Sequence, residues 1–289
     1  MPANLIHSAL GLPMKNVKLC LLTFSAVCLL SGCDSSDNRT NDQYQGINLD
    51  DRKVVSDELS GVWLSLAETN ASVQMDNASL KGKQLVKEYL IINKAGNTLT
   101  MKGCDTDIQY TISGNKLLHD TASDVLDLDF SIIDQSEIRG VVNNQDDSGS
   151  VETNLRMVKV AIETSEQFAT VSISGTLDGN TISDTLPLRC FTEKWATQTT
   201  TSEGKTTDET AHEIEFETTD ENIDFNASIE AGEDYYRFSH MIQGSLYTTS
   251  GSAEKNETRI ISIDTSATTA TTRIFDGANT ANINVALDR

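Results

Sequence analysis

Histidines and carboxylates are the residues of this chain that could support acid–base or metal chemistry. Three of the four histidines, His119, His212 and His240, lie in the C-terminal two thirds of the sequence. No two histidines form a His-x-x-x-His pair, which would place two metal ligands on one helical face. The serine-hydrolase elbow, the phosphate-binding glycine loop and the dinucleotide fingerprint are also absent. A catalytic group assembled from distant residues, such as one histidine and one of the 43 acidic side chains, stays open.

One polar segment could bind a cation. Within residues 143–154, Asn144, Asp146 and Ser148 partly match the alternating oxygen ligands of an EF-hand calcium loop. The twelfth position counted from Asn144 is Leu155, where that loop needs a bidentate glutamate, and no helical pattern flanks the segment. We interpret the segment as a polar hairpin loop, with weak surface calcium binding as the alternative, and expect no cofactor.

The residues before Cys33 have the pattern of an export signal. Lys15 and Lys18 precede an uncharged run of twelve residues, LCLLTFSAVCLL at 19–30, which small residues follow. A short basic segment, an apolar stretch of about 7–15 residues and small residues at the break are typical of a secretory signal peptide. The run is too short to cross a hydrocarbon core of about 30 Å.

The four residues Leu30-Ser31-Gly32-Cys33 resemble the lipobox of bacterial lipoproteins. The resemblance implies that the peptide before Cys33 is removed and that Cys33 carries the acyl chains; an ordinary signal peptide with an incidental cysteine is the alternative. Residues 1–33 are then an upstream extension, up to Met14, and the lipoprotein signal peptide. Several acyl chains on one residue anchor a protein stably, because each buried methylene contributes about 0.8 kcal/mol. We therefore expect a lipid-anchored protein of the bacterial envelope, at the periplasmic face of the inner membrane or at the outer membrane.

The charge of the chain limits its partners. Removal of residues 1–33 takes away two lysines and no acidic residue, so the formal net charge changes from −21 to −23. Such a protein is repelled by phosphate backbones and by anionic lipid headgroups. We therefore expect no nucleic-acid partner, and a membrane contact through the lipid anchor alone.

Two cysteines remain after the signal peptide and the anchor are set aside. Cys104 and Cys190 would lie in an oxidising compartment if the chain is exported, which favours a disulfide between them. The alternative is two separate buried thiols.

The pattern of apolar residues predicts an all-β fold after a flexible tether at residues 34–56. Apolar and polar residues alternate in several stretches, as half-buried antiparallel strands require. Short turn sequences separate these stretches, and Asp178-Gly179 is a strong hairpin signal. We expect an antiparallel meander that forms a barrel or a sandwich. The alternating stretches are VLDLDFSII at 125–133, EIEFE at 213–217, IDFNASIE at 223–230 and INVAL at 283–287.

The segment at 197–210 divides the predicted β region. It contains no large apolar residue and is rich in threonine. We interpret it as a linker between a β domain at 57–196 and a smaller β domain at 211–289. The alternative is one long exposed loop within a single β structure.

The first predicted strand carries an aromatic motif. Gly61 and Trp63, in LSGVWLSL, resemble the Gly-x-Trp motif on the first strand of lipocalins, which are barrels that hold lipophilic ligands. In that family the tryptophan closes one end of the barrel, so the resemblance implies a structural role for Gly61 and Trp63. The alternative is an ordinary core tryptophan, because large aromatic side chains usually serve packing.

These observations favour a binding function. We expect an envelope-anchored β module that binds a small ligand or an envelope protein. An envelope hydrolase is the first alternative and would require a histidine beside a carboxylate in a cleft. A purely structural surface protein is the second.

Overall fold

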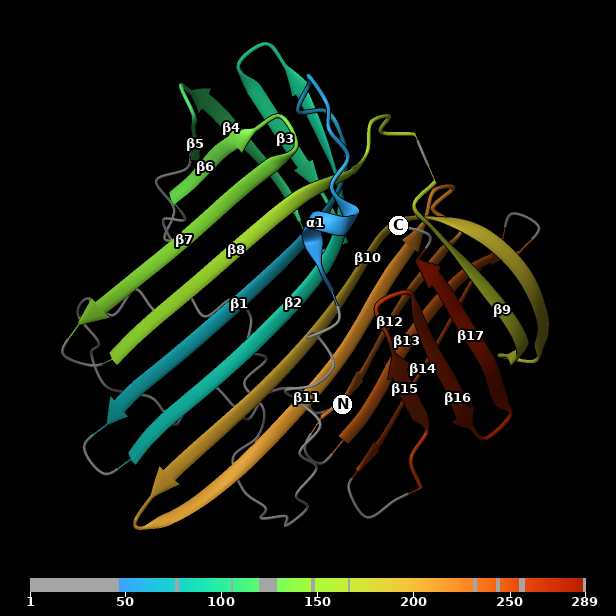
Figure 1. The fold of residues 1–289 in the computed structure, drawn as a ribbon. Coiled ribbons are helices and arrows are strands. Elements are labelled where there is room, and N and C mark those ends of the chain that lie inside the picture. Colours follow the sequence, from blue (N-terminus) through green and yellow to red (C-terminus); the bar gives the residue numbers. More distant parts are fainter. Residues whose placement is uncertain are drawn as a thin grey trace.

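A computed structural model describes residues 47–75, 78–104, 106–119, 129–146, 149–165, 167–230, 233–242, 245–254 and 258–287 of the chain. These residues form one short helix and a sheet system of 17 strands (Figure 1). The predicted all-β class is confirmed, and both predicted architectures occur in the same molecule. Within this part of the chain, no helix is long and apolar enough to span a bilayer.

The first eight strands close into an antiparallel barrel. Each pairs with the next along the chain, and β8 pairs back with β1 from Val62 to Val73. The barrel core contains Trp63, Tyr110 and Phe130, together with aliphatic side chains of the same strands. The strands are β1 (Gly61–Met75), β2 (Ala78–Ala95), β3 (Thr98–Lys102), β4 (Asp107–Ser113), β5 (Lys116–His119), β6 (Asp129–Asp134), β7 (Glu137–Asp146) and β8 (Gly149–Ala161).

Strands β1, β2 and β8 extend beyond the barrel and begin a long sheet. The C-terminal half of β10 pairs with β2 from Ala78 to Tyr89, and β11, β12, β13 and β14 follow in order. Figure 1 shows these strands running diagonally side by side. Their bounds are β10 (Asn180–Ser202), β11 (Lys205–Thr218), β12 (Ile223–Ile229), β13 (Glu233–Ile242) and β14 (Ser245–Glu254).

A short sheet covers one face of the long sheet. It consists of β15 (Ile261–Thr265), β16 (Thr269–Asp276), β17 (Asn279–Leu287), β9 (Ala169–Leu177) and the N-terminal half of β10, hydrogen-bonded in that order. Strand β10 changes sheet at Pro187, next to a register shift between Leu188 and Cys190. The second apolar core lies between the two sheets.

The barrel and the sandwich share a wall. In β1, Val62 and Leu64 belong to the sandwich core while Trp63 belongs to the barrel core. All three are buried, and Met157 and Val158 of β8 repeat this arrangement. Strands buried on both faces have continuous apolar sequences, which explains why these segments do not alternate.

The structure differs from the predicted boundaries in two places. The expected linker at 197–210 is strand: β10 and β11 pair from Leu188 to Thr218, and this segment forms the end of their hairpin. Threonine is β-branched and favours extended backbone, so a polar threonine-rich sequence can form strands. The change from barrel to sandwich falls instead between Ala161 and Ala169, where β8 ends and β9 begins.

Part of the expected tether is docked on the barrel. Helix α1 (Leu49–Arg52) buries Leu49 in the sandwich core. Arg156 of β8 binds Asp50 and Glu137, and Lys53 binds Glu137 at 3.0 Å. These ion pairs link residues distant in sequence, so no local pattern predicts them. Residues 34–46 lie outside the described residues.

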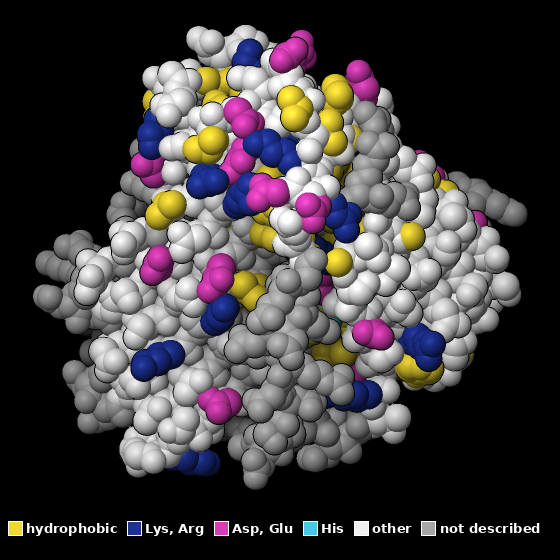
Figure 2. Space-filling model, viewed as in Figure 1, with side chains coloured by type: hydrophobic (Ala, Val, Ile, Leu, Met, Phe, Trp, Pro, Cys, Tyr) yellow, Lys and Arg dark blue, Asp and Glu magenta, His cyan; other side chains and the backbone are white. Residues whose placement is uncertain are grey.

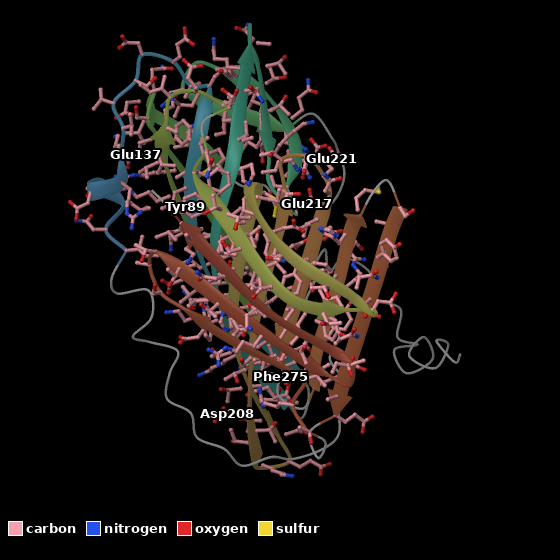
Figure 3. All side chains as sticks on the ribbon, turned by 90° about the vertical axis from the view of Figure 1, so that its right-hand side faces the viewer. Tyr89, Glu137, Asp208, Glu217, Glu221 and Phe275 are labelled. Carbon is pink, nitrogen blue, oxygen red and sulfur yellow. A yellow bond between two sulfur atoms is a disulfide. The ribbon has the colours of Figure 1, made fainter. Side chains whose placement is uncertain are left out.

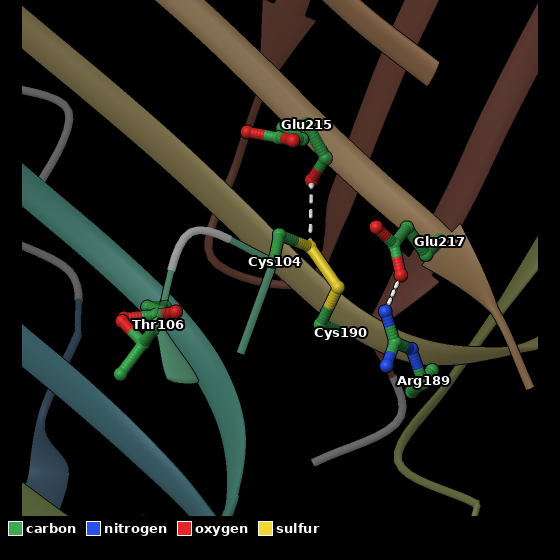
Figure 4. The surroundings of a disulfide bond; sticks show 7 residues. Cys104, Thr106, Arg189, Cys190, Glu215 and Glu217 are labelled. Atoms are coloured by element: carbon green, nitrogen blue, oxygen red, sulfur yellow. Dashed lines mark hydrogen bonds and ion pairs between the residues drawn. A yellow bond between two sulfur atoms is a disulfide. The ribbon is translucent and has the colours of Figure 1, made fainter. Parts of the chain in front are cut away.

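The predicted Cys104–Cys190 disulfide is present in the structure, with the two Cα atoms 5.4 Å apart (Figure 4). Cys104 lies between β3 and β4, and Cys190 lies in β10 just after that strand changes sheet. Beside it, Arg189 forms an ion pair with Glu217 of β11. The bridge therefore joins the barrel to the bend of β10.

Candidate functional site

Two of the three candidate histidines contact a carboxylate. His212 of β11 lies 3.1 Å from Glu193 of β10, and His240 of β13 lies 3.0 Å from Asp184 of the same long strand. His119 is exposed at the end of β5, beside the ring of Tyr110. The hydrolase alternative requires such a histidine–carboxylate pair in a cleft. The surroundings of the two pairs therefore decide whether either pair could act in catalysis.

The Glu193 pair is enclosed in protein. Lys87 of β2 contacts the second carboxylate oxygen at 2.6 Å, and both side chains are 2 % exposed. Trp195 donates its indole N–H to Glu193 at 3.0 Å and stacks on His212. Burial favours the protonated form of Glu193, but the His212 hydrogen bond and the Lys87 ammonium outweigh it and hold the pKa of Glu193 well below its usual range. This carboxylate is ionised, saturated with donors and closed to substrate, which suits a structural role.

Burial also sets the state of His212. Desolvation lowers the pKa of His212, and the opposing hydrogen bond to Glu193 does not reverse the shift. The ring is therefore neutral near pH 7. Because a carboxylate only accepts hydrogen bonds, the ring proton lies on Nε2 and points at Glu193.

The His240 pair borders a very small cavity. The cavity holds about 10 Å³ and is lined by Phe238, Leu177 and Ile182 among other residues. That volume is about the minimum for a single water molecule. The Nδ1 atom of His240 is buried without a hydrogen-bond partner in the described part of the chain.

The barrel end around Trp63 is closed by the preceding chain. The Trp63 indole donates to the carbonyl of Leu59 at 3.0 Å, and the Lys159 ammonium lies 5.5 Å from the ring centroid. Lys159 is fully buried and donates to the Ser56 hydroxyl at 3.0 Å and to the Glu58 carbonyl. Desolvation lowers the pKa of Lys159. Trp63 and Lys159 thus fix the segment that covers this end.

Gly61 is required where the chain covers this end of the barrel. Its φ of +148° lies in a region that other residues rarely adopt, and an added Cβ would lie 2.4 Å from the carbonyl oxygen of Ala161. Both residues of the Gly-x-Trp motif therefore have a structural role in this barrel. The lipocalin resemblance itself stays a prediction.

The outer face of the short sheet has a different character from these buried clusters. Its inward positions are apolar, while its outward positions carry hydroxyl and amide groups, as period-two alternation requires. We call this surface the hydroxyl–amide face. It consists of Thr181, Ser183 and Thr185 of β10, Ser172, Ser174 and Thr176 of β9, Thr280, Asn282 and Asn284 of β17, Thr271, Arg273 and Phe275 of β16, and Ser262 and Asp264 of β15.

Strand register sets these side chains in rows across the sheet. Asn284, Ser172 and Thr185 form one row, in which the Ser172 and Thr185 hydroxyls are 3.0 Å apart. Asn282 and Ser174 begin the next row. A shallow depression of about 290 Å³ lies over these two rows, close to the smaller end of ligand sites in proteins.

Phe275 stands at the edge of this face. Its side chain is 53 % exposed, and its register partner Thr280 begins a row of threonines that continues with Thr176 and Thr181. Figure 3, in which the short sheet faces the viewer, labels Phe275 toward the lower end of the sheet. An exposed aromatic ring beside hydroxyl and amide groups gives this face both apolar and hydrogen-bonding contacts.

The charge of the face is low for this protein. Asp264 and Arg273 are its charged members, and they have opposite signs. Asp184, which pairs with His240 and has a 40 % exposed side chain, adds a carboxylate to the lining of the depression. Figure 2 shows the right-hand part of the molecule, over β9 and β17, mostly in the white of uncharged polar side chains and backbone. The outer positions of β11, by contrast, carry Glu213, Glu215 and Glu217 in succession.

The other predicted site residues are placed as follows. Asn144 and Asp146 belong to strand β7, and Ser148 and Cys33 lie outside the described residues. β7 and β8 pair antiparallel up to Asp146 and Gly149, so most of the described part of the calcium-loop candidate lies in paired strands. Among the residues with described coordinates, no cluster of histidine, cysteine, aspartate and glutamate could hold a metal ion.

No protein-family model, curated protein or solved structure matches this chain significantly.

Sequence reasoning missed the hydroxyl–amide face, although a signal was present. ATVSISGTL and NTANINVAL both alternate small apolar residues with serine, threonine or asparagine. Two such strands predict a sheet with one uncharged polar face.

Proposed function

We propose that this chain is a lipid-anchored binding protein of the bacterial envelope, and that it binds its ligand on the hydroxyl–amide face. The observation that carries the proposal is the depression of about 290 Å³ on a sheet surface that presents mainly hydroxyl and amide groups in a strongly acidic protein. The anchor part of the proposal is supported by the sequence of residues 14–33.

The filled interiors favour an external site. The barrel core is occupied by its own aromatic and aliphatic side chains, and buried apolar side chains likewise fill much of the space between the two sheets. Neither the small cavity beside His240 nor the depression on the short sheet lies inside the barrel. The larger one lies on the outer face of the short sheet, where a ligand reaches it without opening either core.

Labelling of the lipid tests the anchor. Cells grown with radioactive palmitate are expected to label the chain and to retain it in the membrane fraction. Cys33→Ser removes the acylated thiol, so the label is expected to disappear. Label that persists in the Cys33→Ser protein contradicts the assignment.

Cross-linking in living cells tests the binding face. A photoreactive amino acid replaces Ser174 on the hydroxyl–amide face or, as the matched control, Ser250 on the outer face of β14. Both serines are exposed strand positions. Light is expected to produce an adduct of higher mass, discrete or heterogeneous in size, from position 174 and none from position 250. Adducts of equal yield from both positions, or from position 250 alone, contradict the proposed face.

A further inference from the structure

We infer that the ligand of the hydroxyl–amide face is a neutral polysaccharide. The inference rests on the proposed function and names the ligand class of the same site. Three properties of the face carry it: its hydrogen-bonding groups, its exposed aromatic ring, and its small number of charged groups.

The hydrogen-bonding groups match a polyhydroxylated ligand. Serine and threonine hydroxyls and asparagine amides each donate and accept, as sugar hydroxyls do. Asn282 and Asn284 project from β17 two residues apart, and Ser172 and Ser174 project beside them from β9. Side chains at such alternate positions repeat along each strand by about 6.6 Å. A chain of linked sugars presents hydroxyls along its length and can use several of these positions together.

Phe275 supplies the apolar contact. The C–H groups of a pyranose ring carry partial positive charge, and the face of an aromatic ring carries negative charge. With a 53 % exposed side chain, Phe275 is open to a sugar ring stacked on it. Arg273, two residues earlier on the same strand and also exposed, adds a donor that reaches hydroxyl oxygens.

Other ligand classes fit this surface less well. A stable protein interface has an apolar, aromatic-rich centre, whereas Phe275 is the one large apolar side chain of the face. A nucleic acid or an anionic polysaccharide needs basic groups, and Arg273 is the single one here. The formal charge of −21 further disfavours polyanions.

Affinity electrophoresis tests the ligand class and the site. The processed protein, purified in mild detergent, is run through native gels that contain dextran, hydroxyethyl cellulose or glucomannan, with alginate as the anionic comparison. We expect at least one neutral polymer to retard the protein and alginate to leave its mobility unchanged. Phe275→Ala is expected to weaken retardation about fivefold, the order of magnitude of one lost aromatic contact.

Matched variants locate the effect. Tyr235→Ala removes an aromatic side chain of similar exposure, 39 %, from the outer face of β13 and is expected to keep full retardation. Asn282→Ala, in the depression, is expected to weaken it as Phe275→Ala does. Equal retardation of all three variants and the parent protein overturns the site.

The two proposals fail in different ways. If no neutral polymer retards the protein while position 174 still cross-links in cells, the polysaccharide class is wrong and the binding face stands. If position 174 gives no adduct and no polymer retards the protein, both proposals are wrong.

Discussion

At the scale of single residues, the buried charges of Glu193 and Lys159 are held by several neighbouring groups each. Glu193 receives hydrogen bonds from Lys87, His212 and Trp195, three side chains from three different strands. Lys159 is held by a hydroxyl, a carbonyl and an aromatic ring. Such saturated groups specify how strands pack, because an alternative packing would leave a buried charge unpaired.

Removal of the Glu193 charge should destabilise the fold. Glu193→Gln keeps an acceptor for Trp195 but leaves the Lys87 ammonium buried without its counterion, which costs about 3–5 kcal/mol. Denaturant unfolding measures the loss. Lys83→Met, which breaks the exposed pair with Glu68, is the control and should cost less than about 1 kcal/mol. A loss for Glu193→Gln no larger than that of the control contradicts the account.

Acid should loosen the contact between α1 and the barrel. The hydrogen bond from Arg156 lowers the pKa of Glu137 to about 2, below its ordinary value of 4.5. The stability from this carboxylate is therefore complete above pH 4.5 and declines as the pH falls toward 2. The melting temperature should fall less steeply over this range in Glu137→Gln than in the parent protein. Parallel slopes in the two proteins contradict the prediction.

At the scale of elements, alternation predicted strands well where one face of a strand meets a core. Ile214 and Phe216 are buried as predicted, and so are Ile223 and Phe225. The alternation of apolar and polar residues does not identify strands that are buried on both faces or polar on both faces. β1 is buried on both faces near Trp63, and the β10–β11 hairpin end is polar on both, which made residues 197–210 resemble a linker.

The site could be predicted less fully than the fold. The disulfide followed from a count of cysteines and an expected compartment. The hydroxyl–amide face depends on which strands become neighbours, and β9 pairs with β17 more than 100 residues away. The local pattern of apolar and polar residues does not indicate which distant strands pair with each other.

Loss of the disulfide should destabilise the whole molecule. The bridge closes a loop with a sequence separation of 86, for which the chain-entropy model gives about 4–5 kcal/mol. A Cys104→Ala, Cys190→Ala protein should unfold at correspondingly lower denaturant. Its midpoint should also be insensitive to reductant, while that of the parent protein falls. A reductant effect of equal size in both proteins contradicts this.

Gly175 should control the integrity of the hydroxyl–amide face. Its φ is +147°, and an added Cβ would lie 2.0 Å from the carbonyl oxygen of Thr280. Gly175→Val should therefore push β17 from β9, lower the melting temperature and abolish the cross-link from position 174. Gly179→Val, at a turn where no atom lies within 4 Å of the added Cβ, is the control for backbone strain alone. A Gly175→Val protein no less stable than this control contradicts the prediction.

At the scale of the whole molecule, charge is distributed unequally over the two sheets. Acidic side chains crowd the outer face of β11, while the short sheet presents hydroxyls and amides. An acidic surface keeps copies of the protein apart and disfavours polyanions. The hydroxyl–amide face, with few charged groups, suits a neutral polar ligand that hydrogen-bonds to it.

The most direct measurement is binding of the unanchored protein to purified cell envelopes. The mature chain with Cys33→Ser is compared with a variant that adds charge to the depression, Ser174→Asp with Asn282→Asp. The control adds the same charge to β14, Ser250→Asp with Ser252→Asp. The account predicts saturable binding by the parent and the control, and a loss of at least about tenfold in the face variant. Equal binding by all three proteins, or no binding by the parent, would contradict the claim that this face binds an envelope ligand.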